Sequence, residues 1–206
     1  MSPTDRNQLR LAMRQRRNAV GATARINAAR AIADHLRRTR QLRRGQHIGV
    51  YAAFDGEIDL LHVVRHAMRI GCVIYAPRIV SRRRRTMKFI EVDAGVALIG
   101  RRKSDGRSIL EPNRNLHRYI DPQLLDVVLV PVVAFDQCGW RLGFGAGFYD
   151  RKFAFKRHHR HRHPKLIGVA YEQQRLPRQI PGPWDVLLDA VVTEKGVQHF
   201  RHLERG

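Results

Sequence analysis

The sequence has few cysteines, few acidic residues and no long apolar run, and each shortage excludes a class of protein. Its 206 residues include only Cys72 and Cys138, too few for a disulfide framework, which is typical of a reducing compartment. No apolar run approaches the roughly 20 residues of a membrane-spanning helix. The first residues also lack the apolar core of a signal peptide. We therefore expect a soluble cytoplasmic protein that works as a monomer, away from membranes.

The shortage of acidic residues gives the chain a strongly positive charge. Lys and Arg number 39 against 18 Asp and Glu, for a formal net charge of +21. Such a field attracts polyanions, so non-specific attraction to nucleic acid is expected whatever the protein does. The basic clusters are scattered, and aromatic residues make up only 7% of the chain. This pattern favours solvated surface, although a basic nucleic-acid-binding protein remains an alternative.

One basic cluster, KRHHRHRH at 156–163, is rich in histidine. Histidines in such a run can take up Zn²⁺ or Ni²⁺ adventitiously. The interleaved arginines would repel a metal ion, so we expect a solvated loop here.

The distribution of apolar residues predicts an α/β fold in a single domain, residues 1–206. The run LLDVVLVPVVAF at 124–135 is apolar on both faces, as a central parallel strand should be. Helices alternating with such strands predict a mainly parallel sheet flanked by helices in three Rossmann-like layers, with the N-terminal helical segment packed on it. The segment 107–122 is expected to be an excursion with little regular structure.

The expected helices and strands follow from apolar spacing and from start and stop signals. A helix is expected from Ser2, with Leu9, Met13 and Val20 at helical spacing, and Gly71 is expected to end a later helix in a left-handed conformation. The other expected helices cover 23–42, 60–71 and 147–157, and the strands cover 47–54, 72–77, 87–92, 124–135, 166–171 and 189–194.

The segment RLGFGAGFYDR at 141–151 places glycines at every second position between the central strand and a helix. A strand, a glycine loop and a helix in this order favour phosphate binding, because backbone N–H groups converge on the anion and no side chain blocks it. The spacing lacks the G-K-[ST] of a Walker A loop, and Phe148 breaks the dinucleotide pattern. A tight turn that packs beneath the helix is the alternative.

Asp150 follows this loop directly, where its carboxylate would repel a phosphate unless a cation lay between them. Mg²⁺ is commonly held by one or two carboxylates together with nucleotide phosphates. Asp189, at the start of the last apolar strand, is the second candidate ligand. Position alone leaves two ordinary alternatives open, a helix N-terminal acid for Asp150 and a strand-edge charge for Asp189.

The segment VPVVAFDQCGWRLGFGAGFYDR at 130–151 resembles the signature of the 5-formyltetrahydrofolate cyclo-ligase family, also called methenyltetrahydrofolate synthetases. The resemblance continues in order over nearly the whole chain, through YAAFDGEID, YAPRI, MKF, ILEP, IGVAYEQQ and PWDVLLDAVVTEKG. It implies closure of 5-formyltetrahydrofolate to 5,10-methenyltetrahydrofolate, with ATP as co-substrate, Mg²⁺ as cofactor, and release of ADP and phosphate. The γ-phosphoryl group would activate the formyl oxygen before N10 attacks.

The resemblance also implies roles for individual residues. Asp150 and Asp189 would hold Mg²⁺, and Arg141 and Tyr149 would act in catalysis. The implied ATP-binding residues are Arg6, Arg10, Arg141, Leu142, Gly143, Phe144, Gly145, Ala146, Gly147, Phe148 and Tyr149. The implied folate-binding residues are Ala52, Glu57, Gly145, Ala146, Gly147 and Phe148.

Some of these positions differ from the family pattern or have ordinary alternatives. Arg6 replaces the usual lysine, Ala52 replaces a larger apolar residue, and Ala146 replaces a frequent glycine or lysine. Without the resemblance, Glu57 would be an ordinary loop acid, and Arg6 and Arg10 would be exposed helix charges. A sugar-phosphate isomerase or CoA-transferase-like α/β enzyme is a further alternative, but it would need neither ATP nor the paired acids.

Overall fold

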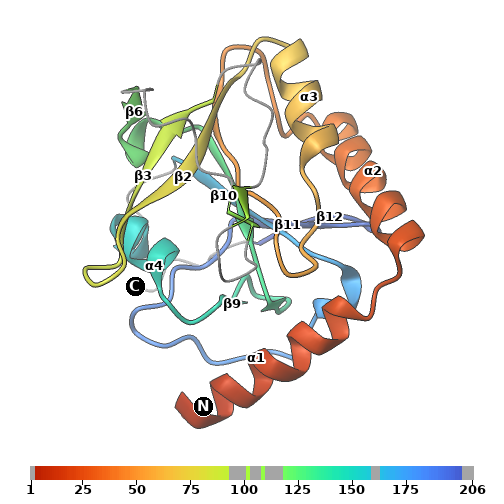
Figure 1. The fold of residues 1–206 in the computed structure, drawn as a ribbon, viewed down its shortest axis with the longest axis vertical. Coiled ribbons are helices and arrows are strands. Elements are labelled where there is room, and N and C mark those ends of the chain that lie inside the picture. Colours follow the sequence, from red (N-terminus) through yellow and green to blue (C-terminus); the bar gives the residue numbers. More distant parts are fainter. Residues whose placement is uncertain (1–2, 93–100, 103–107, 110–117, 159–162, 201–206) are drawn as a thin grey trace.

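The computed structural model describes residues 3–92, 101–102, 108–109, 118–158 and 163–200 (Figure 1). Two expectations therefore fall largely outside the described residues. Residues 110–117 of the expected excursion lie outside them, as do residues 159–162 of the histidine-rich run.

An eight-stranded sheet forms the centre of the fold. Its spatial order is β12 (Gly196–His199), β11 (Ala190–Thr193), β10 (Lys165–Val169), β7 (Val127–Pro131), β1 (His47–Gly49), β2 (Val73–Ser81), β3 (Thr86–Glu91) and β6 (Tyr119–Ile120). The five strands from β11 to β2 run parallel. At the two sides of this group β12 pairs antiparallel with β11, β3 with β2, and β6 with β3. Two short antiparallel hairpins accompany it, β4 (Arg101–Arg102) with β5 (Ser108–Ile109), and β8 (Ala134–Phe135) with β9 (Arg141–Leu142).

Helices cover both faces of this sheet, which confirms the expected three layers (Figure 1). Along β7, Val127 and Leu129 pack with the helices α2 (Ala22–Arg38) and α3 (Leu61–Arg69). Val128 and Val130 pack on the other face with Phe153, which ends the short helix α4 (Phe148–Lys152). Because strand side chains alternate between faces, a strand covered on both sides must be apolar throughout. The 3₁₀ helices are η1 (Pro122–Leu124), η2 (Ala154–His158) and η3 (Glu172–Gln174).

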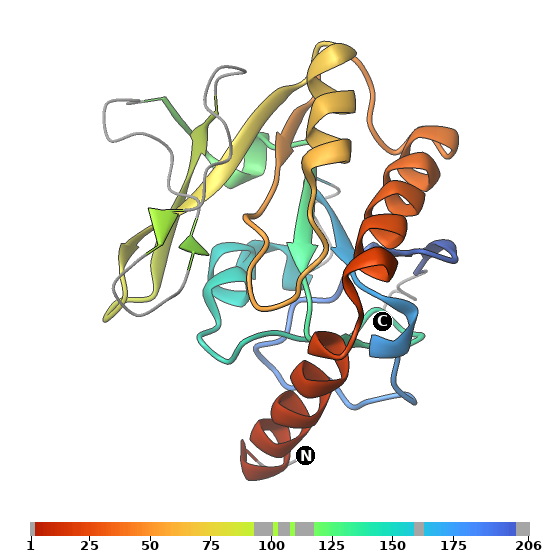
Figure 2. The ribbon, with the colours of Figure 1, turned by 45° about the vertical axis from the view of Figure 1, so that its right-hand side comes forward.

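Within the N-terminal helical segment, α2 packs on the central sheet, and the first helix, α1 (Pro3–Asn18), packs mainly on the β8–β9 hairpin. Met13 of α1 is buried against the β8–β9 hairpin, in a cluster with Trp140 and Leu142. Figures 1 and 2 show α1 at the lower end of the molecule, below α2 and α3.

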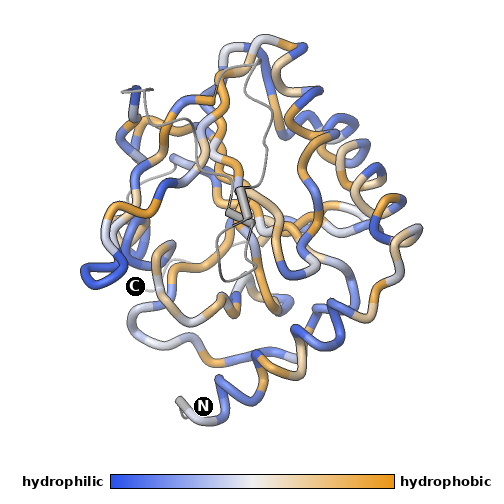
Figure 3. The backbone as a smooth tube through the Cα atoms, in the orientation of Figure 1, coloured by the Kyte–Doolittle hydropathy of each residue, from blue (hydrophilic) through white to orange (hydrophobic). Residues whose placement is uncertain are grey.

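Several elements are shorter than their apolar runs predict. The run 47–54 forms a strand only over His47–Gly49, and the run 124–135 divides into β7 and β8. The division lies at Val132 and Val133, whose carbonyls accept from the Gln174 side chain. After β8, Asp136 Oδ1 accepts from the amides of Cys138 and Trp140, at 2.8 and 2.9 Å, and turns the chain into the β8–β9 hairpin. Figure 3 shows the apolar stretches gathered in the central strands. No helix in the described part of the chain is both long and apolar enough to cross a membrane.

Candidate active site

A cavity of about 1160 Å³ lies at the carboxyl ends of the parallel strands. Open α/β sheets bind their ligands at this edge. Its walls come from α1, the loop after β1, the turn between β2 and β3, the glycine loop and the loop before β11. The predicted site residues that line it are Arg6, Arg10, Ala52, Glu57 and every residue from Arg141 to Asp150.

Asp189, the second predicted metal ligand, does not line this cavity. It directly precedes β11 and therefore lies at the amino end of a parallel strand, the opposite edge of the sheet. One of its oxygens, Oδ2, accepts from Lys156 Nζ at 2.9 Å and from the amide of Leu166 at 2.6 Å. Asp189 thus forms an ion pair at the edge of the sheet opposite the cavity that Asp150 lines.

The glycine loop adopts backbone conformations that explain two of its three glycines. Gly145 has φ +98° and Gly147 has φ +67°, in the left-handed region that favours glycine. A Cβ on Gly145 would lie 3.4 Å from the guanidinium carbon of Arg10. Gly143 has neither constraint, because no atom lies within 4 Å of the place where its Cβ would be. The protein itself therefore does not require glycine at position 143.

The side chains of the loop anchor it on both sides. Leu142 is buried in the cluster with Met13, so it offers the cavity only its backbone. The Phe144 ring stacks on Phe54, with centroids 4.7 Å apart, and the guanidinium carbons of Arg14 and Arg17 lie 5.3 Å from its centroid. The loop is therefore fixed to α1 and to the loop after β1.

Helix α1 presents a row of arginines to the cavity at a spacing of four residues, Arg6, Arg10 and Arg14. This spacing places them on one helix face. Arg10 Nε donates to the carbonyl of Gly143 at 2.9 Å, which connects α1 to the glycine loop. Burial lowers the pKa of Arg10, and the neighbouring charge of Arg6 lowers it further.

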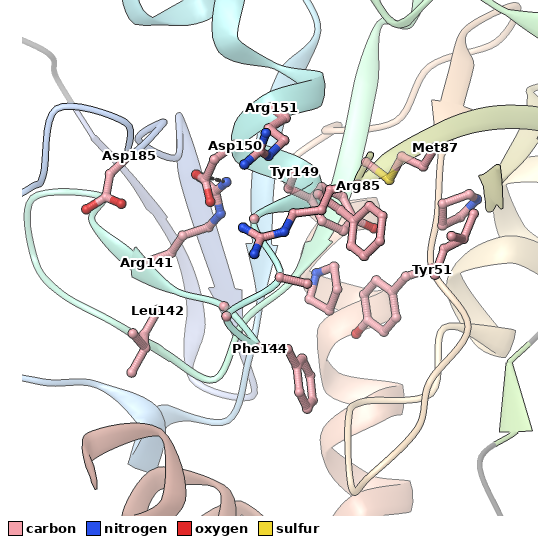
Figure 4. Close-up of a pocket in the computed structure, with 18 of the residues that line it drawn as sticks. Tyr51, Arg85, Met87, Arg141, Leu142, Phe144, Tyr149, Asp150, Arg151 and Asp185 are labelled. Atoms are coloured by element: carbon pink, nitrogen blue, oxygen red, sulfur yellow. Dashed lines mark hydrogen bonds and ion pairs between the residues drawn. The ribbon is translucent and has the colours of Figure 1, made fainter. Parts of the chain in front are cut away.

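Two carboxylates face this row of arginines. Asp150 Oδ1 accepts from Arg141 Nη2 at 2.6 Å and from the amide of Val186 at 3.2 Å. Asp185, which was not predicted, accepts from Arg6 at 2.9 and 3.2 Å and from Trp140 Nε1 at 3.0 Å. Figure 4 shows Asp185 at one end of the close-up, with Arg141 and Asp150 between it and Tyr149.

The pKa of Asp185 reflects two opposing effects. Burial raises it, but hydrogen bonds from Arg6, the amide of Gly182 and Trp140 together lower it below the ordinary value. Asp185 is therefore ionised at neutral pH.

The donors present at this end fit Mg²⁺. Asp150 and Asp185 offer carboxylate oxygens, the hard ligands that Mg²⁺ takes, and Mg²⁺ usually keeps its remaining positions for water and phosphate. Among the described residues there is no group of three His, Cys, Asp or Glu side chains able to enclose a metal ion. An ion held here would thus need oxygens from a bound ligand.

At the other end of the cavity Glu57 is almost completely buried, with its side chain 3% exposed. Its Oε2 accepts from the amide of Phe54 at 3.2 Å, whereas Oε1 is buried without a hydrogen-bond partner. Burial raises the pKa of Glu57 to about 8, against the opposing effect of Arg17, whose Nη1 lies 3.9 Å from Oε1. A ligand N–H group would satisfy Oε1.

The Tyr149 hydroxyl is a second buried polar atom without a partner. Burial raises its pKa, and the charge of Glu57 raises it further, so the hydroxyl remains protonated at neutral pH. It is therefore a hydrogen-bond donor in a cavity wall. The neighbouring Tyr51 differs, because its hydroxyl already donates to the carbonyl of Ile58 at 2.9 Å.

Arg17 holds the loop that carries Glu57. Its side chain is only 1% exposed, and it donates to the backbone carbonyl of Asp55 at 3.0 Å and to Asp55 Oδ2 at 2.9 Å. Arg14 donates to the same Oδ2 at 2.7 Å. A buried charge with this many bonds fixes local geometry. The helix α1 thereby positions both the glycine loop and Glu57.

Two polar residues of the segments that resemble the family, Asp136 and Gln174, bind backbone groups. Asp136, fully buried, also accepts from the amide of Gln179 at 2.8 Å through Oδ2, so both of its oxygens bind backbone. Gln174 donates to the carbonyls of Val132 and Val133 at 2.8 and 2.9 Å. These contacts hold the hairpin that presents Arg141.

The cavity is strongly basic, and its lining arginines were only partly anticipated. Eight arginines line it, namely Arg6, Arg10, Arg14, Arg82, Arg85, Arg141, Arg151 and Arg157. The acidic residues that line it are Glu57, Asp150 and Asp185. A lining of this composition favours ligands that carry several negative charges. Sequence reasoning missed Arg14 and Arg17, whose signal was their spacing from Arg10 on one helix face, and Asp185, which stands four residues before Asp189.

Comparison with known proteins gives a consistent answer. The profile described as the 5-formyltetrahydrofolate cyclo-ligase family matches residues 3–194. The chain is 31% identical to the 5-formyltetrahydrofolate cyclo-ligase of Escherichia coli over 150 residues, 73% of this chain and 79% of that protein. It is 27% identical to that of Haemophilus influenzae over 193 residues, 93% of this chain and 100% of that protein.

Solved structures agree with these relatives. The Aquifex aeolicus 5,10-methenyltetrahydrofolate synthetase superposes with a TM-score of 0.74 at 25% identity, covering 97% of this chain and 96% of that one. The Mycoplasma pneumoniae 5,10-methenyltetrahydrofolate synthetase shares the fold, with a TM-score of 0.70 at 23% identity, covering 92% and 99%. This chain belongs to the 5-formyltetrahydrofolate cyclo-ligase family.

Proposed function

We propose that this protein catalyses the cyclisation of 5-formyltetrahydrofolate to 5,10-methenyltetrahydrofolate, with ATP consumed and ADP and phosphate released. Family membership supports the reaction. The observation that carries the proposal for this chain is one cavity with two different ends. One end has the glycine loop with Asp150 and Asp185, and the other has the unpartnered polar atoms of Glu57 and Tyr149.

The nucleotide phosphates are proposed to bind at the first end. Arg6 and Arg10 provide positive charge from α1, and the glycine loop provides backbone N–H groups without side chains in the way. Asp150 and Asp185 would hold Mg²⁺, which would neutralise charge on the phosphates and orient them. This arrangement explains why two carboxylates can lie in a phosphate site.

The folate pterin is proposed to bind at the second end. A pterin ring presents N–H donors along its polar edge, and the buried Glu57 Oε1 is an acceptor without a donor. Apolar residues beside the glycine loop, among them Pro77, Ile79 and Met87, line the same cavity and suit the aromatic part of a folate.

The reaction needs an activated formyl group, because a formamide oxygen is a poor leaving group. The formyl oxygen would attack the γ-phosphorus, ADP would leave, and an iminium phosphate would form on N5. The N10 amine would then attack the formyl carbon. Cleavage of the carbon–oxygen bond releases phosphate, and N10 loses its proton. Catalysis of such a transfer is mainly positioning and charge neutralisation.

Arg141 and Tyr149 are placed to assist this transfer. The Arg141 side chain is 4% exposed and donates to Asp150 and to the carbonyl of Val186. These bonds fix the position of its charge in the cavity. Its guanidinium would stabilise negative charge on the transferring phosphoryl group. The protonated Tyr149 hydroxyl would donate to an oxygen of the same group.

A direct assay tests the proposed function. The protein is mixed with 5-formyltetrahydrofolate, ATP and Mg²⁺, and formation of methenyltetrahydrofolate is followed by its absorbance. We expect turnover that requires both ATP and Mg²⁺. A flat trace from folded protein, or turnover that persists without ATP, would contradict the proposal.

Gly143 provides a test of the phosphate cradle that leaves the fold intact. Because its Cβ would meet no protein atom within 4 Å, we expect Gly143→Ala to unfold at the same temperature as the wild type. The added methyl group would enter the space proposed for the phosphates. We expect the KM for ATP to rise at least about tenfold, as loss of one strong phosphate contact would do. Unchanged ATP kinetics would contradict the cradle.

A further inference from the structure

Trp184, on the rim of the cavity, has no role in the function proposed above. It lines the cavity, yet its residue is 73% exposed, whereas Trp140 is fully buried. Indole is a large and mostly apolar group, and a tryptophan that stays exposed beside a cavity is commonly covered by a ligand or partner.

The chain holds Trp184 in a fixed position. The amide of Asp185 donates to the carbonyl of Gly182 at 3.1 Å, so Pro183 and Trp184 are the two central residues of a β-turn. Asp185 Oδ2 in turn accepts from the amide of Gly182 at 2.8 Å. The turn is therefore closed by both backbone and side chain, and the indole is presented from a rigid base.

A cation lies against the indole ring. The guanidinium carbon of Arg157 lies 5.5 Å from the ring centroid, and Arg157 itself is tied to the carbonyl of Ala154 at 3.2 Å. Arg157 covers part of one face of the ring, and Trp184 nevertheless stays 73% exposed. An aromatic ring with a cation behind it and an open face in front is a stacking platform for a flat ring.

The neighbours of Trp184 indicate which flat ring it would meet. Asp185, the next residue, is bound by Arg6, and the amide of Val186 donates to Asp150 Oδ1 at 3.2 Å. Trp184 therefore adjoins the proposed phosphate end of the cavity, away from Glu57. A nucleotide held there by its phosphates would have its base directed outward, toward the rim.

We propose that Trp184, backed by Arg157, is the platform on which the purine base of the nucleotide stacks. This inference rests on the proposed function, because it uses the phosphate end assigned there. It adds the group that recognises the base, which neither the glycine loop nor the arginines of α1 would contact.

The test compares ATP with inorganic tripolyphosphate, which has the phosphates but no base. Dissociation constants are measured by calorimetry with Mg²⁺ for the wild type, Trp184→Ala and Trp184→Phe. We expect Trp184→Ala to bind ATP about tenfold more weakly and tripolyphosphate equally well, as the loss of one stacked base predicts. Trp184→Phe should recover most of the ATP affinity. Ile180→Ala is the matched control, because Ile180 is 83% exposed on the same segment but does not line the cavity.

A second readout uses the tryptophans directly. The chain has only two, and Trp140 is fully buried. ATP should therefore quench the fluorescence of the wild type, and the quench should be absent from Trp184→Ala. Equal weakening of ATP and tripolyphosphate by Trp184→Ala would overturn the platform, because Trp184 would then only position Asp185. Nucleotide binding without cyclo-ligase turnover would instead refute the proposed function and leave the platform standing.

Discussion

The Asp150→Asn variant will lose turnover, with kcat reduced by about a thousandfold or more. The substitution keeps the size of the side chain and removes the charge that would bind Mg²⁺ beside the glycine loop. It also removes the ion pair that fixes Arg141, whose Nη2 lies 2.6 Å from Asp150 Oδ1. The measurement is kcat at saturating ATP, folate and Mg²⁺, with circular dichroism to confirm folding.

Two further aspartates extend this test: Asp185 is a second proposed metal ligand, and Asp189 is the control. Asp185→Asn should lower kcat to a comparable extent, because Asp185 lines the same end of the cavity. Asp189→Asn should retain turnover within about twofold but lose stability, because Lys156 would lose its carboxylate while 6% exposed. Removing one partner of this partly buried pair should lower the free energy of unfolding by about 1 to 3 kcal/mol. If Asp189→Asn remained folded but inactive, the pairing of Asp150 with Asp189 would be right after all.

The Glu57→Gln variant is expected to lower kcat/KM for the folate about a hundredfold, with little change in the KM for ATP. The buried Oε1 has no partner, and a site built to accept a hydrogen bond discriminates strongly when that acceptor is changed. A larger effect on ATP than on the folate would show that Glu57 belongs to the nucleotide end.

Because Glu57 can gain or lose a proton, its proposed contact with the folate can also be tested by varying the pH. With its pKa raised to about 8 by burial, Glu57 is mostly protonated at pH 7 in the free protein. Pterin N–H donors would favour the carboxylate, so folate affinity should rise with pH toward 8, and binding at pH 7 should release a proton. Calorimetry in buffers of different ionisation enthalpy measures that proton. Glu57→Gln should release none.

Stability should change with pH in a related way. Because the folded protein holds the Glu57 proton more tightly than the unfolded chain, where the ordinary value of 4.5 applies, the contribution of Glu57 to stability falls as pH rises from about 4.5 to about 8. Glu57→Gln should therefore gain stability relative to the wild type over that range. A constant difference between the two proteins would contradict the raised pKa.

Much of the fold was predictable because a strand buried on both faces appears in the sequence as a continuous apolar run. Val127 to Val130 are all buried, as a central strand covered on both faces requires. Gly71 ends its helix with φ +82°, as its place in the sequence indicated. The division of the run 124–135 was not predictable, because the carbonyls at the break, those of Val132 and Val133, accept from Gln174, far along the chain.

The site was predictable as far as local motifs reach. The glycine loop and Asp150 are contiguous, so their proximity follows from the sequence alone. Choosing between Asp185 and Asp189 required the direction of β11, since a residue just before a parallel strand lies at the edge opposite the ligand site. Asp185 reaches the cavity because the loop that carries it crosses from one edge of the sheet to the other. Trp184 could not be predicted from apolar periodicity, because it lies in the same irregular loop as Asp185.

The long-range contacts of α1 imply that this helix packs late in folding. Arg6 and its partner Asp185 are 179 residues apart, and Arg10 and Gly143 are 133 apart. Helix α1, which is synthesised first, can therefore pack only after the last part of the chain has been synthesised. Until then the apolar face that carries Met13 stays uncovered. A nucleotide that contacts both α1 and the glycine loop would stabilise the packing of α1 against the rest of the protein. Amide hydrogen exchange in α1 should accordingly slow more than elsewhere when ATP binds.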